Sequence, residues 1–124
     1  MTYLATSINE SPVIVEKAGA AIADVRGKAV KFDSNGTIVL AGAGEAAIGV
    51  GIMTNDKNIE VGHDVHIQIK DIGLVCAGAE IKKGAKLAAN ADGALITASG
   101  NEAVAIALDA AAAAGVYIKA IILK

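Results

Sequence analysis

An internal repeat constrains the fold of this chain more than any other feature of its sequence. With Gly27 placed over Gly84, an offset of 57 residues, the segment GKAVKFDSNGTIVLAGAGEA aligns with GAKLAANADGALITASGNEA. A one-residue shift extends the match, and a further change of loop length places Val65-His66-Ile67 over Val116-Tyr117-Ile118. Because turns and apolar segments follow in the same order in both copies, the sequence predicts a duplicated unit.

Each copy carries the signals of β-structure. Ser34-Asn35-Gly36 and Ala91-Asp92-Gly93 contain the Asn-Gly and Asp-Gly pairs typical of tight hairpins. Large and small residues alternate with a period of two in Ala47–Met53 and Ala103–Leu108, which predicts strands with one apolar and one nearly smooth face. We expect their large residues to be core: Ile48, Val50, Ile52, Val104, Ile106 and Leu108. The two glycines between the first three should resist enlargement, because another backbone approaches them closely.

Helical signals are weak by comparison. Ala18–Asp24 and Asp109–Ala114 are shorter than the 12–15 residues or so at which isolated helices become stable, so at most one or two short helical turns are expected. Val116–Leu123 is predicted to be the last strand. The predicted fold class is therefore all-β, a small barrel-like or sandwich-like domain built from two quasi-repeats, at about residues 27–70 and 84–121.

The N-terminal segment differs from the repeats. Thr2 to Ser11 shows no helix or strand period, and Pro12 lacks the N–H that a strand ladder requires. We predict an extended arm at residues 1–12 and a single β domain at residues 13–124. Tyr3, Leu4 and Ile8 are apolar enough to anchor the arm on a partner. Two alternatives remain: an unstructured leader, or pairing within the same subunit.

Composition and charge exclude several functions. Hydrophobic residues make up 54% of the chain but aromatics only 2%, so the predicted core is lean and subunit association would supplement its stability. The net charge is −2 and the basic residues are scattered, which argues against nucleic-acid binding. No signal peptide or membrane span is expected. The single Cys76 cannot form an internal disulfide; it is interpreted as a small core residue in a reducing compartment.

Two motifs suggest chemistry that their surroundings do not support. Gly42-Ala43-Gly44 follows a predicted strand as in a dinucleotide fingerprint, but a strand and not a helix continues after it, and Glu45 would repel phosphates. His63 and His66 are three residues apart, so on a strand they face opposite sides and cannot share one metal ion. No catalytic constellation can be assembled, and we predict that the protein is not an enzyme and has no cofactor.

One short segment resembles a carrier domain. Glu80-Ile-Lys-Lys-Gly-Ala-Lys-Leu87 is similar to the turn and strand of biotinyl and lipoyl carriers, in which two quasi-repeats form a flattened barrel. Those carriers need a modifiable lysine at a hairpin tip, whereas the tips here are Asn35-Gly36 and Asp92-Gly93. A structural or carrier-like β module outside phages therefore stays open as an alternative function.

A second resemblance covers most of the chain. Gly27–Gly36, Ala47–Ile52 and Val65–Ile69, with their echo in Lys83–Leu87, Ala91–Gly93, Val104–Leu108 and Ala110–Ile118, resemble the capsid cement (head decoration) proteins of tailed bacteriophages and prophages. The chain departs from that family in its arm and in the longer connection Thr54–His63.

The resemblance implies a virion structural protein. Such a protein is made in the host cytoplasm, binds the outer surface of the phage head as a homotrimer, and stabilises contacts between subunits of the major capsid protein. The implied partners are thus the major capsid protein and other copies of the chain, without nucleic acid, membrane or small-molecule substrate. Tyr3, Leu4 and Ile8 are the residues we expect to contact the capsid.

Overall fold

Strands joined by turns account for the secondary structure of the described chain. The computed structural model describes residues 12–100 and 102–123, and these residues contain no helix, which confirms the predicted all-β class. Neither of the two segments that could form a helical turn does so, which the predicted upper limit allows: Ala18–Asp24 contains strand β2 (Ile22–Ala23), and Asp109–Ala114 consists of bends, turns and one bridge, from Ala111 to Ile81. Within these residues no sheet closes into a barrel, so the sandwich-like form of the prediction holds.

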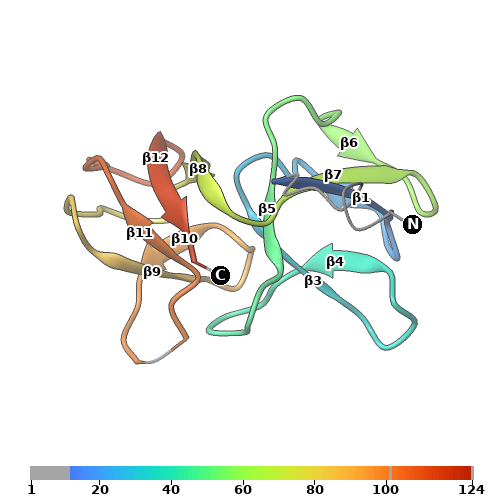
Figure 1. Cartoon of the computed structure of the whole chain (residues 1–124), viewed down its shortest axis with the longest axis horizontal. Helices are drawn as coiled ribbons and strands as arrows, with labels where there is room; N and C mark the ends of the chain where they lie inside the picture. The colour runs from blue at the N-terminus through green and yellow to red at the C-terminus, as the bar shows by residue number, and fades with distance from the viewer. Residues whose placement is uncertain (1–11, 101, 124) are drawn as a thin grey trace, which may run out of the picture.

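Two five-stranded sheets lie side by side as two lobes (Figure 1). The first has the order β1 (Val13–Lys17), β7 (Asp64–Gln68), β5 (Gly49–Gly51), β3 (Ala29–Phe32), β4 (Ile38–Leu40). The second has the order β8 (Asp71–Cys76), β12 (Tyr117–Ile122), β11 (Ala105–Ala107), β9 (Lys86–Ala89), β10 (Leu95–Thr97). A two-stranded ribbon pairs β2 with β6 (Asn58–Ile59).

The two sheets have the same strand order when β1 is matched with β8 and β7 with β12. Their turns match in detail as well: Gly62 N donates to Ala18 O at 2.8 Å, and Gly115 N donates to Ala77 O at 2.8 Å. This match places Val65 over Ile118, two residues from the alignment expected from the sequence. The expected alignment was wrong because a two-residue shift along a strand preserves the buried face, so apolar alternation cannot detect it.

Both predicted hairpins form. In the first, Asp33 N donates to Thr37 O, Gly36 N donates to Asp33 O, and the Asp33 carboxylate accepts from Asn35 N. Among these residues only Gly36 has a positive φ, 76°, so the loop is a type I turn followed by a glycine in the left-handed region. The second hairpin repeats the pattern with Asn90 in place of Asp33 and Gly93 in place of Gly36.

Each sheet has its own apolar core. One cluster lies between the first sheet and the ribbon and is built from Ile22, Val25, Val30, Ile38, Ile59, Val65 and Ile67 with Ala18. The other covers the inner face of the second sheet, with Leu87, Leu95 and Ile118 among its members. Ala29, Ala41 and Val50 belong to this second cluster although they come from the first repeat. The second core thus extends across the junction of the two lobes.

The predicted core face is only partly correct. Val50 is buried, and an added Cβ on either glycine of β5 would collide with backbone, as expected. In β11 the faces are reversed: Ala105 and Ala107 are buried, whereas Ile106 is half-exposed. Ala105 is paired with Leu87 on one side and with Ile122 on the other, both fully or almost fully buried. Between two large core residues there is room only for a methyl group, so the small residues of β11 face inward.

Backbone hydrogen bonds join the two lobes in addition to the shared core. Within the described residues these are Cys76 N to Gly27 O (2.7 Å), Ala29 N to Gly93 O (2.7 Å) and Gly44 N to Ala89 O (2.9 Å). In addition, Gln68 Nε2 donates to the carbonyls of Lys70 and Ile72 and so fixes the connection between β7 and β8. Over residues 12–100 and 102–123, no helix is long and apolar enough to cross a membrane.

Candidate functional site

The glycine loop does not offer its amides to a nucleotide. Glu45 Oε1 accepts a hydrogen bond from Gly42 N at 2.6 Å and lies 2.8 Å from the ammonium group of Lys31. Its pKa is lowered by the Lys31 contact and by the Gly42 amide, so the carboxylate is charged and already satisfies an amide that a phosphate would use. The loop leads into β5 rather than into a helix, as the sequence analysis expects.

The two histidines line a polar cleft of about 450 Å³ at the end of the first sheet. His63 lies in the turn before β7 and His66 lies within it, and both are exposed. Among the described residues, no three His, Cys, Asp or Glu side chains are placed to hold a metal ion. Lys17, which also lines the cleft, is paired with Asp64 at 2.6 Å.

Asn55, the buried polar side chain of the described core, also lines this cleft. Its Nδ2 donates to Ile52 O (2.9 Å) and to His66 O (2.8 Å), while its Oδ1 accepts from His66 N at 2.9 Å. The Asn55 amide therefore makes the hydrogen bonds to β7 that the backbone of a neighbouring strand would otherwise make. Its hydrogen-bonding groups are used within the fold, which indicates a structural role rather than ligand recognition.

Cys76 lies in the junction between the lobes. It is 8% exposed, and burial raises the pKa of its thiol, so the reactive thiolate is disfavoured. The interpretation of this residue as a core cysteine is consistent with that position.

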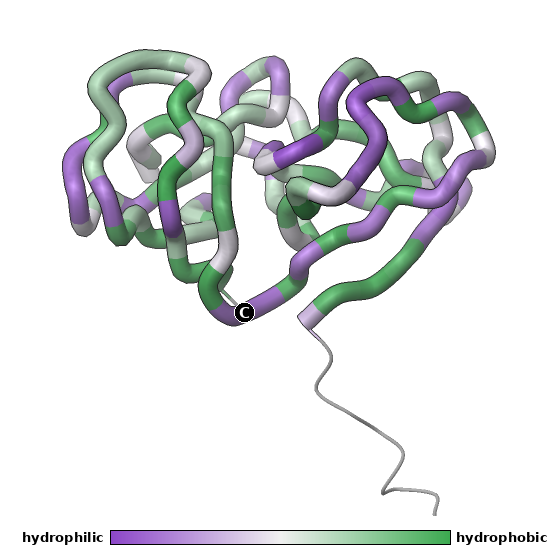
Figure 2. The backbone as a smooth tube through the Cα atoms, turned by 90° about the horizontal axis from the view of Figure 1, so that it is seen from above, coloured by the Kyte–Doolittle hydropathy of each residue, from purple (hydrophilic) through white to green (hydrophobic). Residues whose placement is uncertain are grey.

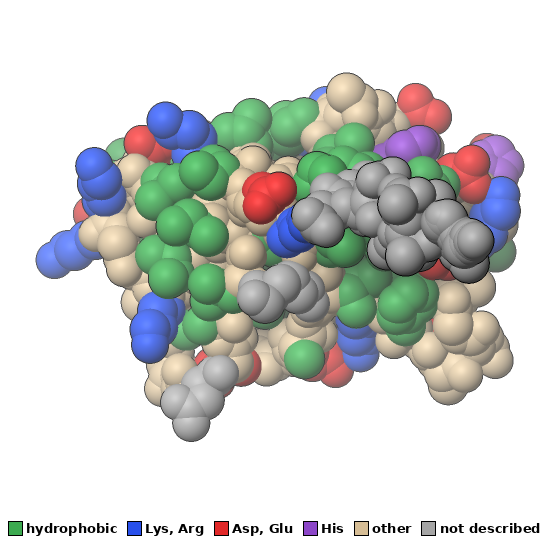
Figure 3. Space-filling model, viewed as in Figure 1, with side chains coloured by type: hydrophobic (Ala, Val, Ile, Leu, Met, Phe, Trp, Pro, Cys, Tyr) green, Lys and Arg blue, Asp and Glu red, His purple; other side chains and the backbone are tan. Residues whose placement is uncertain are grey.

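The candidate interaction site lies on the outer side of the second sheet. Ile72, Ile121 and Ile106 form one row across β8, β12 and β11, and Leu74 and Leu108 flank Lys119 in the next row. We call the five apolar side chains Ile72, Leu74, Ile106, Leu108 and Ile121 the outer apolar face. Ile72 is 59% exposed and Leu74 is 41% exposed, and hydrophobic side chains gather over this sheet in Figure 3.

Matched positions in the first sheet are more polar, because each pair there joins a valine or a lysine of β1 to a polar residue of β7. The pair Leu74–Lys119 corresponds to Val15–His66, and Ile72–Ile121 corresponds to Val13–Gln68. The pair Cys76–Tyr117 corresponds to the ion pair Lys17–Asp64, in which Lys17 lowers the pKa of the Asp64 carboxyl. The same backbone arrangement thus exists with polar side chains along β7, although Val15 of β1 is 48% exposed. The outer apolar face is therefore not a requirement of the fold, and an exposed apolar patch of this kind marks an interaction site.

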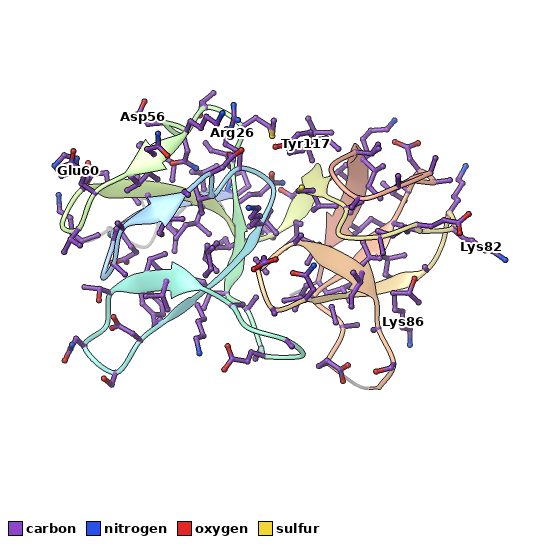
Figure 4. The ribbon with its side chains drawn as sticks, turned by 180° about the vertical axis from the view of Figure 1, so that it is seen from behind. Arg26, Asp56, Glu60, Lys82, Lys86 and Tyr117 are labelled. Atoms are coloured by element: carbon purple, nitrogen blue, oxygen red, sulfur yellow. The ribbon has the colours of Figure 1, made fainter. Side chains whose placement is uncertain are left out.

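Tyr117 closes one end of this face at the junction of the lobes. A Cβ added to Gly27 would lie 3.1 Å from its ring, and Figure 4 shows its side chain next to that of Arg26. Arg26 is held by Asp24, Nε to Oδ1 at 2.6 Å. Burial and the Asp24 charge raise the pKa of the Tyr117 hydroxyl, so the ring presents a neutral edge to solvent at physiological pH.

The outer apolar face was not predicted from the sequence. The arm residues that it selected, Tyr3, Leu4 and Ile8, lie outside the described residues. A signal for the outer apolar face was nevertheless present, because the last predicted strand is apolar on both faces near its end. A strand buried on one side only would alternate, so the excess of apolar residues indicated a second contact surface.

Comparisons with known proteins support the fold. No protein-family model matches the sequence, and no curated protein matches it. Among solved structures, the N base of head fiber gp8.5 of bacteriophage phi29 is similar, with a TM-score of 0.68 and 19% sequence identity. The superposition covers 90% of this chain and 92% of that one. The chain therefore has the fold of a domain that occurs in a phage head fiber.

Proposed function

We propose that this protein is a structural component of a bacteriophage virion, where it binds the outer surface of the head as a decoration (cement) protein. The similarity to the base of a phage head fiber, which extends over 90% of the chain, carries the proposal. The resemblance of the sequence to head decoration proteins points to the same class. A structural role also agrees with an interaction surface made of apolar side chains instead of reactive groups.

The proposed partner is the major capsid protein. Binding would stabilise contacts between its subunits, with the outer apolar face and the arm residues Tyr3, Leu4 and Ile8 as the contact surfaces. Burial of one Leu or Ile side chain of the face contributes about 1–2 kcal/mol, which corresponds to roughly tenfold in affinity. Many equivalent sites on a head allow such modest contacts to suffice.

Co-sedimentation with heads that lack the protein tests this function. Expanded heads of the phage that carries the gene, prepared without this protein, should bind the wild-type chain at saturating, stoichiometric occupancy. L74S should weaken binding about tenfold, because the Leu74 side chain is 41% exposed within the outer apolar face and would be buried by the partner. V15S is the matched control, since Val15 holds the equivalent position on the first sheet and is similarly exposed. Absence of wild-type binding would refute the proposed function.

Trimer formation on the head belongs to the same proposal and derives from the resemblance alone. Light scattering on the free protein and the stoichiometry on heads measure it directly. A multiple of three chains per binding position is expected, and a stable dimer would contradict it.

A further inference from the structure

One charged side chain lies inside the outer apolar face. Lys119 is on β12, the strand between β8 and β11, and the alternation of exposed and buried residues along β12 directs it outward together with Tyr117 and Ile121. Leu74 of β8 and Leu108 of β11 lie opposite Lys119, one on each side. On this side of the sheet, the four nearest neighbours of Lys119 are therefore apolar or aromatic.

The charge of Lys119 is not neutralised by its own chain. Within residues 12–100 and 102–123, each ion pair joins residues of the first lobe, and neither Lys119 nor Lys86, which is paired with Ile106 at the border of the face, takes part in one. The carboxylate of Asp109 is near, but its Oδ2 accepts from the backbone N of Lys119 at 3.2 Å. The outer apolar face thus presents an unpaired positive charge.

A partner that covers the apolar side chains of the face also covers Lys119. Figure 2 shows the strands of this lobe as mainly hydrophobic with short hydrophilic interruptions. Burial of Leu74 and Ile121, which are 41% and 36% exposed, favours binding, and Lys119 lies between these two side chains. An ammonium group that loses its water is costly unless a carboxylate compensates its charge. The covering surface therefore needs a carboxylate at this position.

We propose that the part of the major capsid protein that covers the outer apolar face carries an Asp or Glu side chain that pairs with Lys119. This inference rests on the proposed function and adds the chemistry of the partner surface, which is apolar side chains around one carboxylate. The apolar contacts supply affinity. The ion pair fixes the orientation of the partner, because a different orientation leaves both charges buried without a partner.

Replacing Lys119 with methionine tests the proposal, because the presence and the absence of a carboxylate predict opposite results. If a carboxylate faces Lys119, K119M leaves it unpaired in the interface, and the affinity for heads that lack the protein should fall at least about tenfold. Without a carboxylate, K119M replaces a charge by an apolar group in an apolar surface, and binding should be equal or tighter. Equal or tighter binding of K119M would overturn the proposal.

Three variants serve as controls for this measurement. K57M removes an exposed lysine of the first lobe and should bind as wild type does. D109N keeps an acceptor for the backbone N of Lys119 and should also bind as wild type does. A loss with D109N equal to that with K119M would place the partner carboxylate in the same chain and contradict the proposal. K119Q is a second neutral variant with the same expected loss, and circular dichroism of the free variants checks that they fold.

Carbodiimide treatment of decorated heads gives an independent measurement. The reagent joins an amine to a carboxylate in direct contact with it, so mass spectrometry should find Lys119 linked to an Asp or Glu of the major capsid protein. A link to Asp109 of the same chain, or no link from Lys119, would argue against the pair. The two proposals fail separately. Heads that do not bind the wild-type chain refute the proposed function and this inference with it, whereas wild-type binding together with full affinity of K119M refutes the inference alone.

Discussion

Replacing Asn55 with alanine should destabilise the fold more than its position beside an open cleft suggests. N55A removes three hydrogen bonds, two donated to carbonyls of Ile52 and His66 and one accepted from His66 N. Both carbonyls keep a second partner, since Asn55 N donates to Ile52 O and Ile52 N donates to His66 O. The N–H of His66 loses the acceptor that the structure gives it.

The magnitude follows from these contacts. A buried donor left without a partner costs about 1–3 kcal/mol, and each of the other two bonds contributes about 0.5–1 kcal/mol. The expected loss is about 2–5 kcal/mol in the free energy of unfolding, a large share of the 5–15 kcal/mol or so that is typical of a domain. For a chain of 124 residues this lowers the Tm by roughly 8–20 °C.

Urea denaturation and thermal unfolding followed by circular dichroism measure this loss. N58A is the control, because Asn58 is exposed and lines the same cleft. N55D gives a second test: its carboxylate would face two carbonyl oxygens, so its pKa in the folded state rises above the unfolded value. The variant should therefore be more stable at pH 4 than at pH 7 relative to wild type, because that stability is lost as pH rises through the folded pKa. Equal stability of N55A and N58A would refute the reasoning.

Two further predictions concern the core and the junction of the lobes. A105L should destabilise by about 1–3 kcal/mol or more because no space exists beside its buried neighbours, whereas I106A on the half-exposed side should cost less; urea denaturation of both variants decides the orientation of β11. G27A should lower the Tm far more than G36A. Both glycines have a positive φ, but only at Gly27 would an added Cβ meet backbone, because it would lie 2.7 Å from Cys76 N in the second lobe. Similar Tm values for the two glycine variants would contradict the close approach at the junction.

The sequence predicted the class of the fold because glycine turns and period-two alternation are local signals. Both hairpins at Gly36 and Gly93 follow from them. The orientation of β11 could not be predicted in the same way, because it depends on two neighbours, Leu87 and Ile122, that are distant in the sequence. Where alanine alternates with isoleucine, hydrophobicity favours burial of the larger residue, but packing between neighbouring large side chains decides the outcome.

The candidate site was harder to predict for a related reason. The outer apolar face combines residues of β8, β11 and β12, and β8 was not among the strands expected from the sequence. The sequence shows that Ile72, Leu74 and Ile121 are apolar, but not that they share one side of a sheet. Only the pairing of strands brings them together. Apolar side chains on three neighbouring strands distinguish this surface from a single exposed apolar residue such as Val15.

The junction of the two lobes has a consequence for how such a protein changes over time. Its three direct bonds join peptide groups, which every residue type except proline can supply in full. Substitutions on the two exteriors therefore leave these bonds intact, provided that Gly27, Gly93 and the shared core residues Ala29, Ala41 and Val50 remain. A duplicated unit built in this way can keep one exterior polar for solubility while the other acquires a new binding preference. The low identity of 19% to a phage protein of the same shape is what such freedom allows.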